Sequence, residues 1–167
     1  MENAVLTPET LPHRECVIEG AIETLSSICG TPVQASESVG ASLPCIVAVV
    51  SLVGDMPCSV ALGLPHDSAV AVAAKLAGFE IPFESSDMGD AIGEVANMIA
   101  GTVKAKLEQR GVSSSISLPS VMRCTSLEML SYHKLPSHRW GLDSGCGPLW
   151  IEAVSAGDAI PTRRPGA

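Results

Sequence analysis

The segment from about residue 87 to residue 110 constrains the fold most, because its apolar residues recur every three or four positions. At about 100° per residue, this spacing places them on one side of an α-helix as a buried stripe. Asp87 is expected to cap the helix, with Asp90 three residues later, and Gly111 to end it. The stripe comprises Ile92, Val95, Ala96, Ile99, Val103 and Leu107.

Other segments predict the remaining elements. A first long helix is expected over about 12–29, ending before Gly30 and Pro32. Residues 43–53 and 56–64 are rich in β-formers on either side of a Gly54-Asp55 turn, which predicts a hairpin. A shorter helix is expected over 66–77, closed by Gly78. Further strands are predicted over 112–118 and near 124–132 and 148–155, whereas 79–86 is read as a loop and 132–147 is assigned to no element.

No repeat or linker divides the chain, so one α/β domain of mixed element order (an α+β fold) is expected over 12–156. Residues 1–11 are expected to form a flexible N-terminal tail, and residues 157–167 a disordered C-terminal tail. Hydrophobic residues make up 46% of the chain and aromatic residues 3%, so the core must consist mainly of Val, Ile, Leu and Ala.

Charge and hydropathy exclude several partners. The formal net charge of −8 and the few aromatic rings disfavour nucleic acid, which carries negative phosphates and stacks its bases on rings. The longest apolar stretch, 43–53, is shorter than the roughly twenty residues of a membrane span. The N-terminus lacks the basic start and apolar run of a signal peptide, so a cytoplasmic protein without membrane contact is expected.

Six cysteines, at positions 16, 29, 45, 58, 124 and 146, show no close pairing in the sequence. Most lie in apolar segments, where a free cysteine behaves as a small hydrophobic residue. In the expected compartment these are predicted to be reduced thiols of the core.

The face of the 87–110 helix opposite the stripe carries the candidate site. Glu94 and Asn97 are three residues apart, so their side chains stand together. Gly101 lies one turn further on, although glycine inside a helix costs about 1 kcal/mol relative to alanine; Gly93 adds a second such cost. One interpretation is that these are ordinary solvated residues and neutral glycines. The other is a binding face that a partner approaches closely at Gly101. This face comprises Asp90, Glu94, Asn97, Gly101, Lys104 and Glu108.

The motif on this helix resembles the signature of the CheC, CheX and FliY family of CheY-P phosphatases. The resemblance rests on DAIGEVANMIAGTVK (residues 90–104) and is extended by ISLP (116–119), the preceding hairpin and the 65–78 helix. It covers about residues 12–155. It implies a CheC-like or CheX-like fold, with a β-sheet and two long helices.

Some members of this family repeat the motif on the first helix. Here Glu19 and Glu23 are followed, three residues later, by Ile22 and Ser26 rather than by asparagine. A single site therefore remains, as in CheX. CheX-type members form homodimers through their sheets, so the resemblance also implies a homodimer.

The resemblance implies a phosphatase that hydrolyses the phospho-aspartate of a CheY-type receiver domain. Asn97 would hold the attacking water and Glu94 would pair with the receiver's lysine, while Asp90, Gly101 and Lys104 would contact the partner. The receiver would carry the Mg²⁺, and this chain would need no metal or cofactor of its own. A module that docks a receiver without turnover would use the same acidic face, and a structural dimer with no receiver partner is a third interpretation.

Two other constellations are weaker. Residues 143–148 superficially resemble the nucleophile segment of trypsin-like proteases, but the chain is short for that fold and has no matching histidine segment, so a glycine-rich turn is predicted. His133, His138, Cys124 and Cys146 lack the paired spacing of zinc ligands, and the two histidines are predicted to lie in loops.

Overall fold

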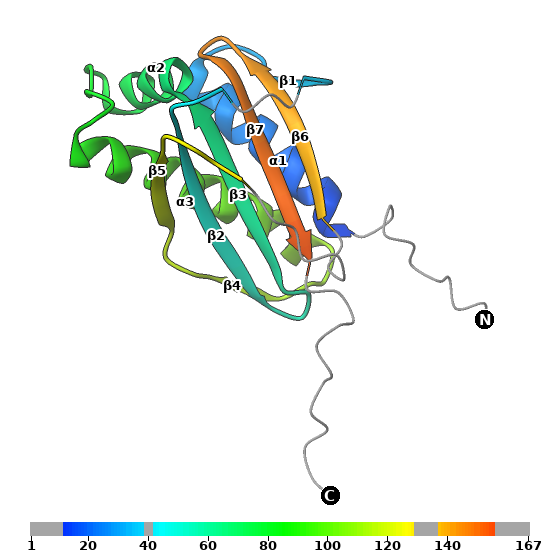
Figure 1. Ribbon diagram of the computed structural model, residues 1–167. Helices are drawn as coiled ribbons and strands as arrows, with labels where there is room; N and C mark the ends of the chain where they lie inside the picture. Colours follow the sequence, from blue (N-terminus) through cyan, green and yellow to red (C-terminus); the bar gives the residue numbers. More distant parts are fainter. Residues whose placement is uncertain (1–11, 39–41, 129–136, 156–167) are drawn as a thin grey trace, which may run out of the picture.

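The computed structural model describes residues 12–38, 42–128 and 137–155. Three helices cover one face of a seven-stranded sheet (Figure 1). All strand pairings in the described part of the chain are antiparallel, so the fold is α+β rather than a mixed α/β order. The elements are α1 (Pro12–Cys29), β1 (Gln34–Ser36), β2 (Cys45–Gly54), β3 (Cys58–Pro65), α2 (His66–Ala77), α3 (Ser86–Gln109), β4 (Ser114–Ile116), β5 (Ser120–Cys124), β6 (Ser137–Ser144) and β7 (Gly147–Ser155).

The strand order is β1-β6-β7-β3-β2-β4, and β5 also pairs with β2. The predicted hairpin is confirmed as β2–β3, in which Ile46 lies opposite Leu64. Alternate residues of β2 point toward the helices, as period-two alternation requires. These are the buried residues Ile46, Ala48, Val50 and Leu52.

One strand prediction was wrong and two strands were missed. The strand expected near 124–132 lies earlier, at Ser120–Cys124, and residues 129–136 fall outside the described part. The strands β1 and β6 were not predicted, and His138 lies on β6 rather than in a loop. In β6 only Trp140 and Leu142 carry the apolar alternation, which is too short to distinguish a strand from the surrounding polar sequence. The predicted tails, 1–11 and 157–167, also lie outside the described residues.

The start of α3 is capped by Ser85 and not by Asp87. The Ser85 Oγ accepts a hydrogen bond from the Met88 N–H at 3.3 Å, and Ser85 itself has extended backbone. This satisfies one of the N–H groups that the first turn of a helix leaves unpaired. At the other end Gly111 adopts a left-handed φ of 77°, close to the predicted stop.

The C-terminal half of helix α3 packs closely against α1. A Cβ on Gly20 of α1 would lie only 2.8 Å from the Val103 side chain, so glycine permits this close helix contact. The hydroxyls of Thr24 and Thr102 form a hydrogen bond of 3.0 Å across the interface. These contacts hold the buried side of α3 against the core. No helix among the described residues combines the length and hydropathy needed to cross a membrane.

Stability is expected to fall as pH falls, because of a buried histidine in α1. His13 is 2% exposed, and its Nδ1 has no hydrogen-bond partner in the described residues. Burial, and secondarily the charge of Arg14, lowers the pKa of His13. The unfolded chain therefore binds a proton more readily, so stability is present above the ordinary histidine pKa of about 6.5 and is lost as pH falls below it.

Urea unfolding between pH 5 and 8 checks this prediction. One proton limits the slope to about 1.4 kcal/mol per pH unit. The variant His13→Phe is expected to flatten this part of the profile, and an unchanged slope would show that His13 is not the responsible group.

Candidate functional site: a groove along the third helix

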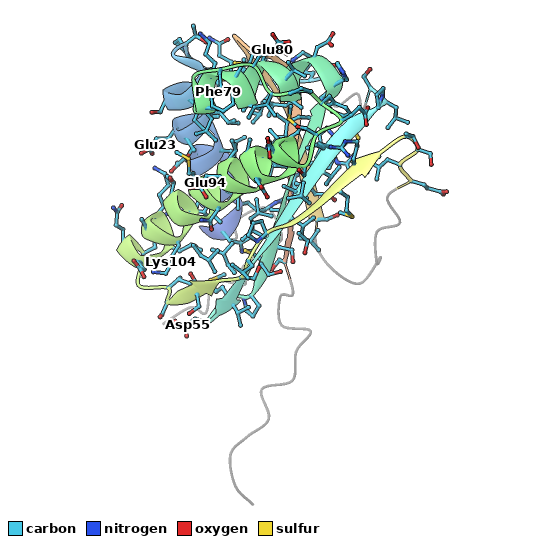
Figure 2. All side chains as sticks on the ribbon, turned by 90° about the vertical axis from the view of Figure 1, so that its left-hand side faces the viewer. Glu23, Asp55, Phe79, Glu80, Glu94 and Lys104 are labelled. Carbon is cyan, nitrogen blue, oxygen red and sulfur yellow. The ribbon has the colours of Figure 1, made fainter. Side chains whose placement is uncertain are left out.

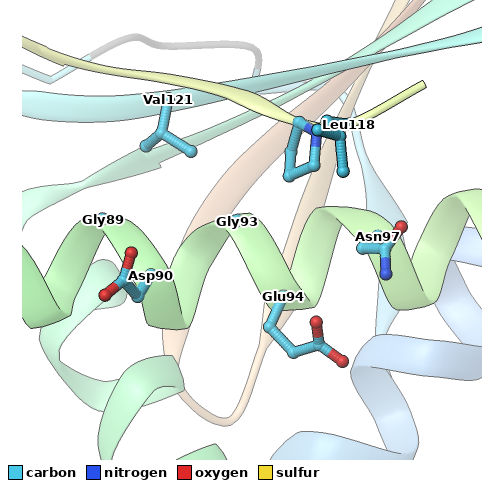
Figure 3. Close-up of a pocket in the computed structure, with 8 residues that line it drawn as sticks. Gly89, Asp90, Gly93, Glu94, Asn97, Leu118 and Val121 are labelled. Atoms are coloured by element: carbon cyan, nitrogen blue, oxygen red, sulfur yellow. The ribbon is translucent and has the colours of Figure 1, made fainter.

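A groove of about 300 Å³ runs between α3 and the segment that joins β4 to β5 (Figure 3). The helix supplies one wall, and the β4–β5 segment together with the start of β5 supplies the other. The groove lies where the motif residues of the sequence analysis are found. Its lining comprises Gly89, Asp90, Gly93, Glu94, Asn97, Leu118, Pro119 and Val121.

The helix wall is polar and unengaged. Asp90, Glu94 and Asn97 follow one another along the exposed face of α3 (Figure 3). Within the described part of the chain, Glu94 and Asn97 have neither a hydrogen bond nor an ion pair, and both side chains are exposed. A carboxylate and a carboxamide thus stand side by side with all their hydrogen-bonding capacity available to a partner or to water.

The opposite wall is apolar, and a glycine brings it close to the helix. A Cβ on Gly93 would lie 3.3 Å from the Val121 side chain and 3.6 Å from that of Pro119. The absence of a side chain at Gly93 therefore lets the β4–β5 segment approach α3. Leu118 stands at the rim and is 90% exposed.

Sequence reasoning did not assign this apolar wall to the site. Leu118 and Pro119 were recognised only as part of a family-like strand, and Gly93 only as a cost to the helix. A usable signal was present: Gly89 and Gly93 are four residues apart, so they leave one strip of the helix surface without side chains.

The other two predicted contact residues lie outside the groove lining. Gly101 is half-buried, and a Cβ there would meet nothing within 4 Å. The Lys104 Nζ pairs with Glu108 at 2.7 Å and so points along the helix toward its C-terminal end. Figure 2 shows Glu94 and Lys104 on the same helix. The structure thus brings Asp90, Glu94 and Asn97 together around the groove, with Gly101 and Lys104 further along the same helix.

Arg123 connects β5 to the start of α3. Its Nε donates to the Phe83 carbonyl at 3.0 Å, and an Nη donates to the Ser85 carbonyl at 2.7 Å. Ser85 is the cap of α3, and the guanidinium also lies 5.6 Å from the centre of the Phe83 ring. These contacts set the spacing of the two groove walls, since one side chain ties the strand to the helix end.

On α1, the residues at which a second copy of the motif would lie make contacts within the protein. Glu19 and Glu23 lie 3.9 Å and 2.8 Å from the Lys106 Nζ, and the Ser26 hydroxyl accepts a hydrogen bond from the Val33 N–H. No second unengaged Glu–Asn pair is therefore present on this helix.

The rival constellations do not assemble in the described residues. There is no group of three or more His, Cys, Asp or Glu side chains that could hold a metal ion. The 143–148 segment is a tight turn between β6 and β7, as predicted, with Ser144 opposite Gly147. His138 packs against the Trp140 ring, with the ring centres 4.4 Å apart.

Comparison with known proteins identifies a family to which this sequence is similar. The family model described as chemotaxis phosphatase CheX matches residues 46–139, which is more than half of the chain. No curated protein sequence matches significantly.

Among solved structures, CheX from Desulfovibrio desulfuricans is 22% identical, with a TM-score of 0.72 over 87% of this chain and 99% of that one. CheX from Vibrio vulnificus is 14% identical, with a TM-score of 0.75 and the same coverage. The CheX–CheY–BeF3–Mg²⁺ complex from Borrelia burgdorferi gives a chain that is 18% identical, with a TM-score of 0.63 over 86% of this chain and 96% of that one. The fold is shared throughout, and by the match of its sequence the chain belongs to the CheX family.

Proposed function

We propose that this protein dephosphorylates a CheY-type response regulator by positioning water for attack on its phospho-aspartate. The observation that carries this proposal is the unengaged Glu94–Asn97 pair on the rim of the α3 groove. It is supported by membership of a family described as chemotaxis phosphatases, and by the solved complex in which a related CheX binds CheY.

In this mechanism the receiver domain provides most of the chemistry. Its Mg²⁺ and lysine hold the phosphoryl oxygens, so the phosphatase has only to place water in line with the leaving carboxylate. The Asn97 carboxamide can both donate to and accept from that water. Glu94 offers a negative charge to the receiver's lysine and so sets the register of docking. This chain uses no cofactor and forms no covalent intermediate.

Docking is expected to depend on Leu118 as well as on charge. An exposed leucine beside a polar pair gives a partner an apolar anchor, and its burial contributes roughly 1.5–3 kcal/mol. The variant Leu118→Ser should therefore weaken the apparent affinity for the phosphorylated receiver about tenfold or more, with the turnover rate at saturation retained. Rates measured over a range of receiver concentrations test this. A fall in turnover alone would contradict an anchoring role.

We also propose that two copies associate through the sheet in the cytoplasm. The helices cover one face of the sheet, while Met122 on β5 and Val53 at the end of β2 leave apolar area exposed, at 48% and 59%. Sedimentation equilibrium measures this directly, and a monomer at micromolar concentration would contradict it.

The direct test follows the decay of a phosphorylated CheY-type receiver from the same organism with and without this protein. Accelerated release of phosphate supports a phosphatase. Tight binding without acceleration would instead indicate a docking module that uses the same face. Neither binding nor acceleration would leave only the shared fold.

A further inference from the structure

Two cysteines far apart in the sequence meet on the sheet face opposite the helices. In the register of β2 and β5, Cys45 lies directly opposite Cys124. Directly opposed residues of antiparallel strands have Cα atoms about 4.5–5.5 Å apart and point to the same face. That separation is within the range that disulfides span. The two side chains also belong to the same small cluster on this face, so they pack in one place.

We propose that Cys45 and Cys124 form a reversible redox pair, which a peroxide closes to a disulfide and a cellular thiol reopens. All six cysteines are free thiols in the structure, and Cys124 is the one that is not buried. In the single chain it is therefore the sulfur that an oxidant in solution reaches first. Reducing conditions in the cytoplasm would make such a disulfide transient.

The chemistry balances with hydrogen peroxide as the oxidant. The Cys124 sulfur attacks a peroxide oxygen, the O–O bond breaks, and a sulfenic acid and one water are formed. The Cys45 sulfur then attacks the Cys124 sulfur, the S–O bond breaks, and the hydroxyl leaves as a second water with the Cys45 proton. Two thiols and one peroxide thus give one disulfide and two waters. Burial, and secondarily the neighbouring Cys124, raise the pKa of Cys45 to about 11, so the Cys45 thiol is not the one expected to react first with peroxide.

The disulfide would fasten an edge strand that borders the groove. Strand β5 has five residues and pairs only with β2 in the described part of the chain. Val121, on the opposite face of β5 from Cys124, forms part of the groove's apolar wall. The proposal concerns the thiols alone and does not depend on the phosphatase activity.

Thiol counting on the full reduced chain tests the proposal. Peroxide is expected to lower the count in denaturant from six to four per chain, and dithiothreitol to restore it. Mass spectrometry of tryptic peptides should find residue 45 linked to residue 124. Cys124→Ser, with five thiols, should keep all five. The matched control Cys29→Ser should fall from five to three, because Cys29 is buried and takes no part in the link between residues 45 and 124.

Three results would overturn it. These are six thiols after peroxide, a link between Cys29 and Cys146 that persists in Cys124→Ser, or a disulfide between two chains on a non-reducing gel.

Discussion

The variant Asn97→Ala is expected to lose about 10²-fold or more of the receiver dephosphorylation rate while keeping its affinity for the receiver. Loss of a positioned reactant has effects of this size, because the attacking water then has to find its alignment by itself. Affinity should persist because Glu94 and the apolar wall remain on either side of the groove. The fold should also persist, since the Asn97 side chain is exposed and makes no hydrogen bond within the described residues.

Single-turnover decay rates and a binding titration, measured on the same protein, separate these two quantities. Asn97→Asp keeps the shape but replaces the amide donor with a negative charge, so it should also be impaired. Glu108→Gln is the matched control, because it lies about three turns along the same face and outside the groove. A variant Asn97→Ala that retains the wild-type rate would remove the water-positioning role.

The buried side of α3 was predicted correctly because helical periodicity alone determines which side of a helix is buried. Helical periodicity reports which side of a segment is buried, and all six residues of the predicted stripe are buried in the structure. The same wheel placed Glu94 and Asn97 on the exposed face, where the structure has them. The candidate pair could therefore be identified before any tertiary contact was known.

The groove itself could not be predicted in this way. Its second wall comes from residues 118–121, which follow Asn97 by more than five helical turns' worth of sequence, and their position depends on the pairing of β5 with β2. That pairing is an edge contact of a short, largely exposed strand, so it leaves little hydrophobic pattern in the sequence. Arg123, which ties this strand to the cap of α3, carries no local signal of its role.

The glycines also show that tertiary contacts explain positions that the local sequence does not. Within one helix, Gly93 is explained by the approach of Val121, whereas Gly101 has open space around the position of its missing side chain. Gly63, on β3, is a third case. It lies directly opposite Trp150 of β7, and the indole occupies the space that a side chain at position 63 would need.

Gly63→Ala is accordingly expected to destabilise the fold by about 3 kcal/mol, the upper part of the range for overpacking. The Trp150 ring cannot move aside easily, because it is 1% exposed and lies under the Arg139 guanidinium at 4.2 Å. Arg139 is itself held by Glu152 at 2.7 Å. Urea unfolding followed by circular dichroism measures the loss. Gly101→Ala, the matched glycine change in open space, should instead stabilise by up to about 1 kcal/mol.

A double-mutant cycle identifies the cause of the Gly63→Ala effect. If the alanine methyl collides with the indole, then Gly63→Ala should cost much less in a Trp150→Leu background than in the wild type, so the two changes would not be additive. If the cost were the same in both backgrounds, the effect would come from the β3 backbone and not from the ring. The cycle matters for the site because β3 pairs with β2, and β2 holds both β4 and β5. A collision at Gly63 would therefore disturb the strand on which the groove's apolar wall depends.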